Sequence, residues 1–185
     1  MKFLRFFIII FISLTTSIKA DLYKNLINQL EAGGKLIFIR HAYAPGNGDP
    51  AGFNLNDCST QRNLSDDGRK QAQRIGEFFT KNKIEIDKVL SSEWCRCKET
   101  AKIAFKNYST NSFLNSFYSS KFSKNKDKQV KAFNYYIKNL ESEKNLIFVT
   151  HYVFISEVLN YGPSSGEIVV SDKNLNIIGS IEIDF

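Results

Sequence analysis

The amino-acid sequence predicts an α/β fold, a three-layer sandwich with a mostly parallel central sheet flanked by helices. Two short runs, Leu36 to Ile39 and Leu146 to Val149, are apolar at every position, which is the pattern of strands covered on both faces. Segments whose apolar residues recur at helical spacing separate such runs along the chain. Alternation of buried strands with amphipathic helices is typical of a parallel sheet with helices on both faces.

The expected elements follow one another in chain order. Helices are expected at residues 22–30, 66–79 and 94–105 and in a stretch ending at 140, and strands at 36–39, 86–90, 146–150, 168–170 and 181–185. Gly33 and Gly34 provide a stop for the first helix, and Ser65 a cap for the second. The lysine-rich segment 119–131 is expected to be a solvated loop or a helix start, with a mobile lid as the alternative.

The first twenty residues have the features of a secretory signal peptide. Lys2 and Arg5 precede an apolar run from Phe6 to Leu14, and polar residues lead from there to Ala20. The alternative is a membrane anchor, but this run is far shorter than the roughly 20 residues that span a bilayer. We therefore expect residues 1–20 to be removed, leaving one domain at 21–185 with no stable membrane span in a periplasmic or secreted protein.

Composition argues against nucleic acid and metal as partners and does not decide how the cysteines pair. The formal charge of +6 falls to +3 without the three basic residues of the first twenty, which is too little to indicate nucleic-acid binding. With only two histidines and no CxxC pair, we expect no metal and no other cofactor. In an oxidising compartment Cys58 is expected to pair with Cys95 or Cys97, and three buried thiols are the alternative.

The positions of the two histidines carry the most information. His41 and His151 each come at the end of one of the two continuous apolar runs. Ligands of open α/β sheets bind beyond the carboxyl ends of the strands, so neighbouring strands would place both imidazoles in one crevice. The alternative is two isolated histidines, each satisfied by a backbone carbonyl.

Four ordered segments resemble the histidine phosphatase superfamily, the phosphoglycerate mutase-like proteins. These are Arg40-His41-Ala42 followed by Pro45, Leu64 to Ala72, Ser91 to Ala101, and Val149-Thr150-His151. The third is similar to the family's S-x-x-x-R-A-x-x-T-A segment, with Arg96 as its arginine. Asp57 to Leu64 and Ser164 to Glu167 resemble an exported bacterial subgroup, some of whose members are associated with lipopolysaccharide phosphate groups.

The resemblance implies that His41 is the nucleophile and that Arg40, Arg96 and His151 form a phosphate clamp. The chemistry is consistent in itself. A neutral imidazole can attack phosphorus when guanidinium forks and a second imidazole neutralise the phosphoryl oxygens. Arg62, in the loop after the first strand, is a candidate for substrate binding, whereas Arg69 is expected on a helix surface.

The general acid of the resembling proteins has no clear counterpart here. The mutase-like branch carries a glutamate in the region that here reads Phe113 to Phe117, and the other branch an aspartate where Tyr152 stands. Glu167, Asp57 and Glu93 are the candidates, in that order. A good leaving group needs no protonation, so the reaction can also proceed without an acid.

These observations lead to one expected function and one rival. We expect an exported phosphatase that hydrolyses a phosphomonoester, either a phosphorylated small molecule or an envelope glycolipid, through a phosphohistidine intermediate. The rival is a non-catalytic phosphate-ligand binding protein with a degenerate phosphatase pocket. A protein that only binds anions has no need of a nucleophilic histidine at position 41.

Overall fold

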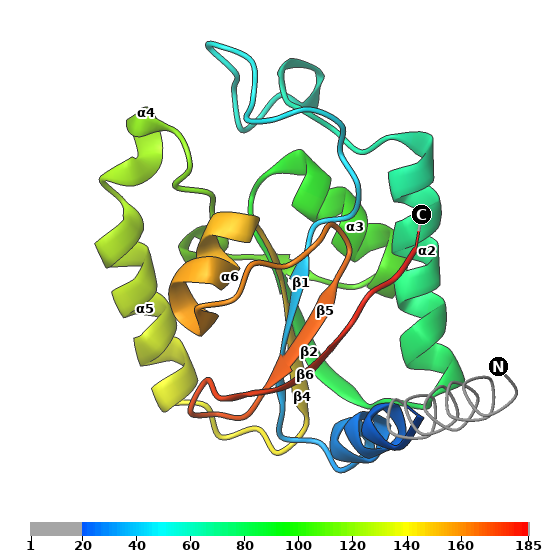
Figure 1. Cartoon of the computed structure of the whole chain (residues 1–185). Coiled ribbons are helices and arrows are strands. Elements are labelled where there is room, and N and C mark those ends of the chain that lie inside the picture. Colours follow the sequence, from blue (N-terminus) through cyan, green and yellow to red (C-terminus); the bar gives the residue numbers. More distant parts are fainter. Residues whose placement is uncertain (1–19, 185) are drawn as a thin grey trace, which may run out of the picture.

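A six-stranded mixed sheet forms the centre of the computed structural model, which describes residues 20–184. The strands are β1 (Leu36–Arg40), β2 (Ile86–Ser91), β3 (Ser109–Thr110), β4 (Asn145–Thr150), β5 (Ile168–Ser171) and β6 (Ile177–Ile181), in the order β3-β2-β4-β1-β5-β6. The first four strands of this order are parallel, and β5 runs antiparallel to β1 and β6. The predicted α/β class with a mostly parallel sheet is confirmed (Figure 1).

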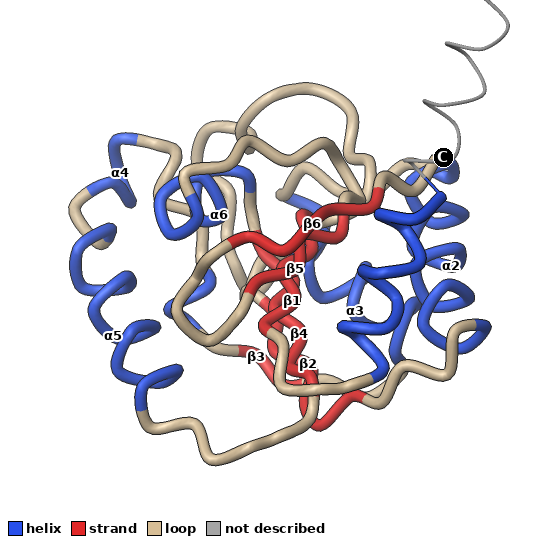
Figure 2. The backbone as a smooth tube through the Cα atoms, turned by 60° about the horizontal axis from the view of Figure 1, so that its bottom comes forward, coloured by secondary structure: helices blue, strands red, loops and turns tan. Residues whose placement is uncertain are grey.

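Helices cover both faces of the sheet, as Figure 2 shows by viewing the strands nearly end on. Helical residues 20–31, α2 (Asp66–Lys81) and α3 (Cys95–Phe105) pack on one face. On the other face lie α5 (Lys126–Lys138) and α6 (Tyr152–Leu159), with the short helix α4 (Ser120–Ser123) and the 3-10 helix η2 (Ser112–Leu114) beside them. A second 3-10 helix, η1 (Cys58–Thr60), lies in the loop after β1.

Alternation along β1 divides the core into two apolar layers. Ile37 and Ile39 belong to the layer under α2 and α3, whereas Leu36 and Phe38 belong to the layer under α5 and α6. All four side chains are fully buried. Both faces of the strand are therefore covered, which explains why its sequence is apolar without interruption.

Helix α2 begins where the sequence predicts and lies very close to the chain after β1. The Ser65 hydroxyl accepts a hydrogen bond from the Gly68 amide at 3.1 Å, capping the helix. A β-carbon at position 68 would collide with the Tyr43 carbonyl oxygen. Glycine is required here because any side chain would push the helix away from the segment that follows His41.

Two sequence expectations change in detail. The strand expected at 181–185 lies earlier, at Ile177–Ile181, because its partner β5 has only four residues and the pairing ends at Ile168 opposite Ile181. The lysine-rich segment contains α4 and the start of α5. The predicted signal peptide lies outside the described residues except for Ala20, and no helix within residues 20–184 is long and apolar enough to cross a membrane.

Candidate active site

The carboxyl ends of β1 and β4 bring the two histidines together. These strands are parallel neighbours with Arg40 opposite Thr150, and the His41 amide donates to the Thr150 carbonyl at 2.9 Å. The two imidazole rings are both buried, with centroids 5.5 Å apart. Similar sequence patterns at the ends of adjacent parallel strands thus produce a site with two histidines at the carboxyl ends of the central strands.

One nitrogen of His41 is held by the backbone and the other is left for chemistry. Nδ1 lies 2.9 Å from the Ala42 carbonyl oxygen, which can only accept, so Nδ1 carries the proton and Nε2 has a free lone pair. Thr100 holds this backbone, because its hydroxyl accepts from the Ala42 amide and donates to the Arg96 carbonyl at 2.7 Å. The imidazole is therefore fixed in the tautomer that a nucleophile needs.

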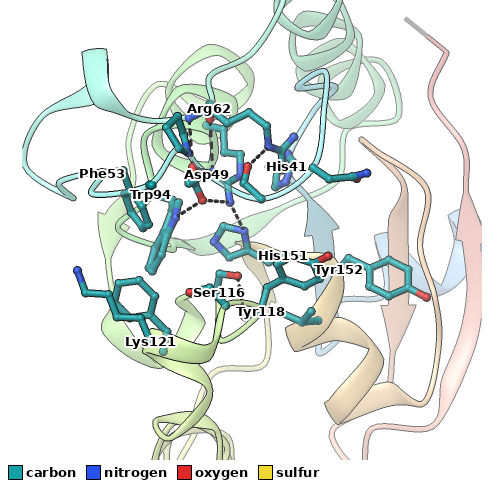
Figure 3. A pocket seen from close by; sticks show the side chains of 18 of the residues that line it. His41, Asp49, Phe53, Arg62, Trp94, Ser116, Tyr118, Lys121, His151 and Tyr152 are labelled. Atoms are coloured by element: carbon teal, nitrogen blue, oxygen red, sulfur yellow. Dashed lines mark hydrogen bonds and ion pairs between the residues drawn. The ribbon is translucent and has the colours of Figure 1, made fainter.

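Arg96 is buried beside the histidines and paired with Asp49. Its two terminal nitrogens lie 2.7 and 3.2 Å from the two carboxylate oxygens of Asp49, and both side chains are less than a tenth exposed. Asp49 also accepts hydrogen bonds from the Trp94 indole at 3.0 Å and from the Arg62 amide at 3.1 Å. Figure 3 shows the carboxylate at the centre of this network. It ties the loop after β1 to the start of α3.

Two buried guanidinium nitrogens lack a partner within residues 20–184. These are Nε of Arg40 and Nε of Arg96. The rest of Arg40 is held in place, because a terminal nitrogen donates to the Pro163 carbonyl at 2.9 Å and the guanidinium lies 5.5 Å from the Tyr152 ring centroid. Buried donors are nearly always hydrogen-bonded in folded proteins, so these two unpaired donors, both on arginines that line the cavity, are exceptions.

His151 is oriented by a chain of hydrogen bonds. Arg96 donates toward Nδ1 at 3.4 Å, and Nε2 lies 2.9 Å from the Ser92 hydroxyl. That hydroxyl donates in turn to the side-chain oxygen of Asn115 at 3.1 Å. These contacts put the ring proton on Nε2 and point Nδ1 at the guanidinium.

Burial sets the charge state of both imidazoles. Removal from water holds the pKa of His41 well below its ordinary value, and the charge of Arg96 lowers it further. The same two causes, in the same order, hold the pKa of His151 well below its ordinary value. Both rings are therefore neutral at neutral pH, and His41 needs no deprotonation before it can attack an electrophile.

The predicted catalytic residues line one cavity of about 490 Å³, which Figure 3 shows from close by. Arg40, His41, Arg96 and His151 all contribute to its wall. Arg62 also lines the cavity, while its guanidinium donates to the carbonyls of Gly48 and Ala44. The structure thus gathers five of the six residues selected from the sequence, with Arg62 both at the cavity and holding its own loop.

The sixth residue, Glu167, is not among the side chains that line the cavity. It is buried, and its carboxylate accepts hydrogen bonds from the Tyr161 hydroxyl at 2.5 Å and the Ser164 amide at 2.7 Å. Asp57 and Glu93 also lie outside the lining, where Asp57 caps η1 and Glu93 accepts from Asn115. Among the described lining residues, Asp49 is the only carboxylate.

The structure contains one of the two disulfide pairings that the sequence left open. Cys58 and Cys95 form a disulfide, which joins η1 to the first residue of α3, directly before Arg96. Cys97 is a free buried thiol, and burial raises its pKa to about 12. The described residues contain no group of three histidine, cysteine or acidic side chains placed to hold a metal ion.

Sequence reasoning missed Asp49, Trp94 and Phe122 as parts of the site. Asp49 lies within the stretch rich in glycine, proline, asparagine and aspartate, where the composition indicates a loop but no contact. Its role depends on a contact 47 positions along the chain. The length of this loop was the available signal, since long loops beside a candidate site often carry function.

Solved structures share the fold of this chain. The protein histidine phosphatase SixA complexed with tungstate superimposes with a TM-score of 0.58 at 15% sequence identity, covering 81% of this chain and 96% of that one. Phosphoglycerate mutase from Thermus thermophilus gives a TM-score of 0.55 at 16% identity, covering 81% of this chain and 99% of that one. These likenesses establish the α/β fold that the chain shares with both structures.

A family model matches part of the sequence. Residues 36–113 match the model of the histidine phosphatase superfamily, branch 1, and this stretch contains His41, Arg62 and Arg96. No curated protein matches the chain significantly in sequence. The matched segment covers less than half of the chain, and over that part the sequence resembles the histidine phosphatase superfamily.

Proposed function

We propose that the protein is an exported phosphatase that hydrolyses a phosphomonoester through a phosphohistidine on His41. The observation that carries the proposal is the state of His41. Its Nδ1 proton is held by the Ala42 carbonyl, its Nε2 has no hydrogen-bond partner among residues 20–184, and Arg40 and Arg96 line the same cavity. A site that only bound anions would not require a neutral imidazole with a free lone pair.

The proposed reaction has two displacements at phosphorus. In the first, Nε2 of His41 forms a bond to phosphorus as the bond to the ester oxygen breaks, and the oxygen leaves as an anion that water protonates afterwards. In the second, water attacks the phosphohistidine, phosphate leaves, and the neutral imidazole is restored. The net change is hydrolysis of a phosphate ester by one water molecule.

The arginines have the role of stabilising charge during both steps. Arg40 and Arg96 both line the cavity, and a guanidinium matches the geometry of phosphoryl oxygens. Donors already fixed by Asp49 and Pro163 need no rearrangement as charge builds up, which is the condition for strong electrostatic catalysis. His151 lines the same cavity, and its Nδ1 faces the Arg96 guanidinium, which it helps to hold in place.

Export and the class of substrate are parts of the same proposal. The first twenty residues read as a signal peptide, and a disulfide between Cys58 and Cys95 suits an oxidising compartment. The relatives in fold include a protein histidine phosphatase and a phosphoglycerate mutase, both named for phosphoryl chemistry. We propose a phosphorylated small molecule or envelope glycolipid as the substrate.

The test is replacement of His41. We expect His41→Ala to abolish phosphate release from an aryl phosphate while circular dichroism and thermal unfolding stay close to the wild type. Rapid quench of the wild type in alkaline denaturant should give a phosphoenzyme that is labile to acid and stable to base, and the variant should give none. If the variant kept more than about a tenth of wild-type turnover, a ratio worth about 1.4 kcal/mol of barrier, the phosphohistidine mechanism would be wrong.

A further inference from the structure

The cavity is larger than a phosphate clamp, and part of its wall has no assigned role. Arg40, His41, Arg96 and His151 account for one region of a space of about 490 Å³. The remainder comes mainly from two segments, 47–53 in the loop after β1 and 116–122, which runs into α4. A volume of this size is in the range of pockets that enclose a whole small molecule.

Aromatic side chains from both segments, together with Trp94, pack against one another and form one wall of the cavity. The ring centroids of Phe53, Trp94 and Phe122 lie 5.3 to 5.7 Å from one another. The Trp94 ring is also 5.3 Å from the His151 ring, so the aromatic surface reaches from the second histidine outward. Tyr118, which is 66% exposed, continues the lining at the mouth. Figure 3 shows Phe53, Trp94 and Lys121 on the side of the cavity opposite Tyr152.

Charge in the cavity exceeds what one phosphate needs. Four cationic side chains contribute to the lining, against the single carboxylate of Asp49, which is already paired with Arg96. Lys121 belongs to the segment 116–122 and lies in α4. No carboxylate of residues 20–184 forms an ion pair with it. Its ammonium group lies 5.4 Å from the Phe122 ring centroid, at the edge of the aromatic wall.

We propose that the substrate is a ring-bearing phosphomonoester that carries a second anionic group. This inference rests on the proposed function. The phosphate to be removed lies at the two histidines, the face of the ring lies against the aromatic wall, and the second anion reaches Lys121. Flat apolar faces of rings pack well on aromatic side chains, and an unpaired lysine at the far end complements a second negative charge. A sugar or a nucleoside would supply the ring equally well.

The test compares matched phosphate esters by their kcat/KM for phosphate release. Two pairs differ in the second anion, fructose 6-phosphate against fructose 1,6-bisphosphate and adenosine 5′-monophosphate against adenosine 3′,5′-bisphosphate. An acyclic ester with a second anion, 3-phosphoglycerate, tests the need for a ring. We expect at least one bisphosphate to exceed its monophosphate by about tenfold, which corresponds to about 1.4 kcal/mol, and to exceed the acyclic ester by a similar factor.

Variants of the lining residues test whether the preference for ring-bearing bisphosphates depends on Lys121 and Tyr118. Lys121→Ala should reduce the ratio of bisphosphate to monophosphate to about the factor of two that two equivalent phosphates give by statistics. Tyr118→Ala should reduce the advantage of ring esters over the acyclic one. Lys124→Ala, a lysine three positions along the same segment and outside the lining, should leave both ratios unchanged. Both Lys121 and Tyr118 are exposed, so these changes spare the core.

The outcomes distinguish failure of the substrate inference from failure of the proposed phosphatase function. Equal kcat/KM for all esters, or a preference that survives Lys121→Ala, would overturn this inference and leave the phosphatase standing. Release of phosphate from none of these esters while an aryl phosphate is hydrolysed would overturn this inference alone, and no release from the aryl phosphate either would overturn the proposed function and the inference with it. A preference shown by the fructose pair alone would assign the ring to a sugar, and one shown by the adenosine pair alone to a nucleoside.

Discussion

Two neutral histidines, buried beside arginines, respond to pH in a defined direction. Their pKa values are held well below the ordinary value near 6.5, so below that pH the unfolded chain binds protons that the folded chain does not. The stability they contribute is fully present above about pH 6.5 and is lost as the pH falls toward their folded pKa values. The free energy of unfolding should therefore decrease on acidification from about pH 6.5.

Ring signals in an NMR titration measure this directly, because the chain has only two histidines. We expect both imidazoles to stay neutral at about pH 6, with His41 as the Nδ1–H tautomer, and His41→Asn to assign the signals. Addition of phosphate should raise both pKa values, since an anion offsets the arginine charges. A ring that titrated at or above about pH 6.5 in the free protein would contradict the burial seen in the structure.

Asp49 is the residue whose importance the sequence concealed. Removing one partner of a buried ion pair leaves the other charge uncompensated, which costs about 3–5 kcal/mol of stability. We expect Asp49→Ala to lower the free energy of unfolding by about this amount in urea denaturation, and to lower kcat/KM by about 10²-fold through loss of the fixed Arg96 geometry. Phosphate at high concentration should recover part of the lost stability by replacing the carboxylate beside Arg96.

The matched control is Glu77→Gln, an exposed acid of α2 that forms no ion pair among residues 20–184. It should change stability by less than about 0.5 kcal/mol and leave kcat/KM unchanged. Wild-type kcat/KM in Asp49→Ala would show that the ion pair anchors the loop without positioning the guanidinium for catalysis.

Among the elements, α3 has an unusual start, because its N-terminus is held from outside the helix. The side chain of its N-cap residue Trp94 forms no capping hydrogen bond. Instead, the amide oxygen of Gln61 accepts from the Cys95 backbone N–H at 3.0 Å, and the disulfide joins Cys95 to Cys58. The loop after β1 therefore takes the place of a side-chain cap and fixes the turn that carries Arg96.

Reduction of this disulfide should weaken both the fold and the site. A cross-link across 37 residues stabilises a protein by about 3–4 kcal/mol through the entropy of the unfolded chain. We expect dithiothreitol to lower the melting temperature and to raise KM more than it lowers kcat, because the loop carrying Asp49 and Arg62 gains freedom. The variant with both Cys58→Ser and Cys95→Ser should behave like the reduced protein and no longer respond to reductant. An unchanged melting temperature on reduction would show that the loop holds its place without the cross-link.

Elements also show how far sequence reasoning could go. The continuous apolar run of β1 and the Ser65 cap of α2 are local signals, and both elements form as predicted. The end of β6 and the choice of Cys95 over Cys97 depend on contacts between distant segments, which one-dimensional patterns do not contain. For the site, the ends of the buried strands could be recognised in the sequence, and they pointed to His41 and His151. The arginines were found in the segments that resemble the phosphatase motifs. The loop residue Asp49 could not, since its partner is fixed only by the tertiary fold.

For the molecule as a whole, the missing proton donor has a kinetic consequence. Asp49 is the only carboxylate among the described residues of the cavity wall, and both its oxygens already accept hydrogen bonds from fixed donors. The leaving oxygen would then depart with its charge, and the rate should depend steeply on the pKa of the leaving alcohol. Aryl phosphates should be hydrolysed much faster than alkyl phosphates, as a series of substituted phenyl phosphates would measure.

Glu167 remains the first candidate for an acid by sequence, and the same series tests it. If Glu167 protonated the leaving group, the dependence would be shallow in the wild type and steep in Glu167→Gln. Its carboxylate is engaged by Tyr161 and Ser164, so we expect a steep dependence in both proteins. A shallow dependence in the wild type that was unaltered by Glu167→Gln, Asp57→Asn and Glu93→Gln would indicate a donor such as His151.

The order of strands has a consequence for how activity arises during synthesis. β4 lies between β1 and β2 in the sheet, although it follows both of them in the chain. A growing chain that has emerged only as far as α3 has the nucleophile and Arg96, but the strand that separates β1 from β2 is still missing. If the proposed phosphatase activity is correct, we expect it to arise only after β4 has inserted and brought His151 beside His41. Recovery of turnover on refolding should then follow the closure of the sheet.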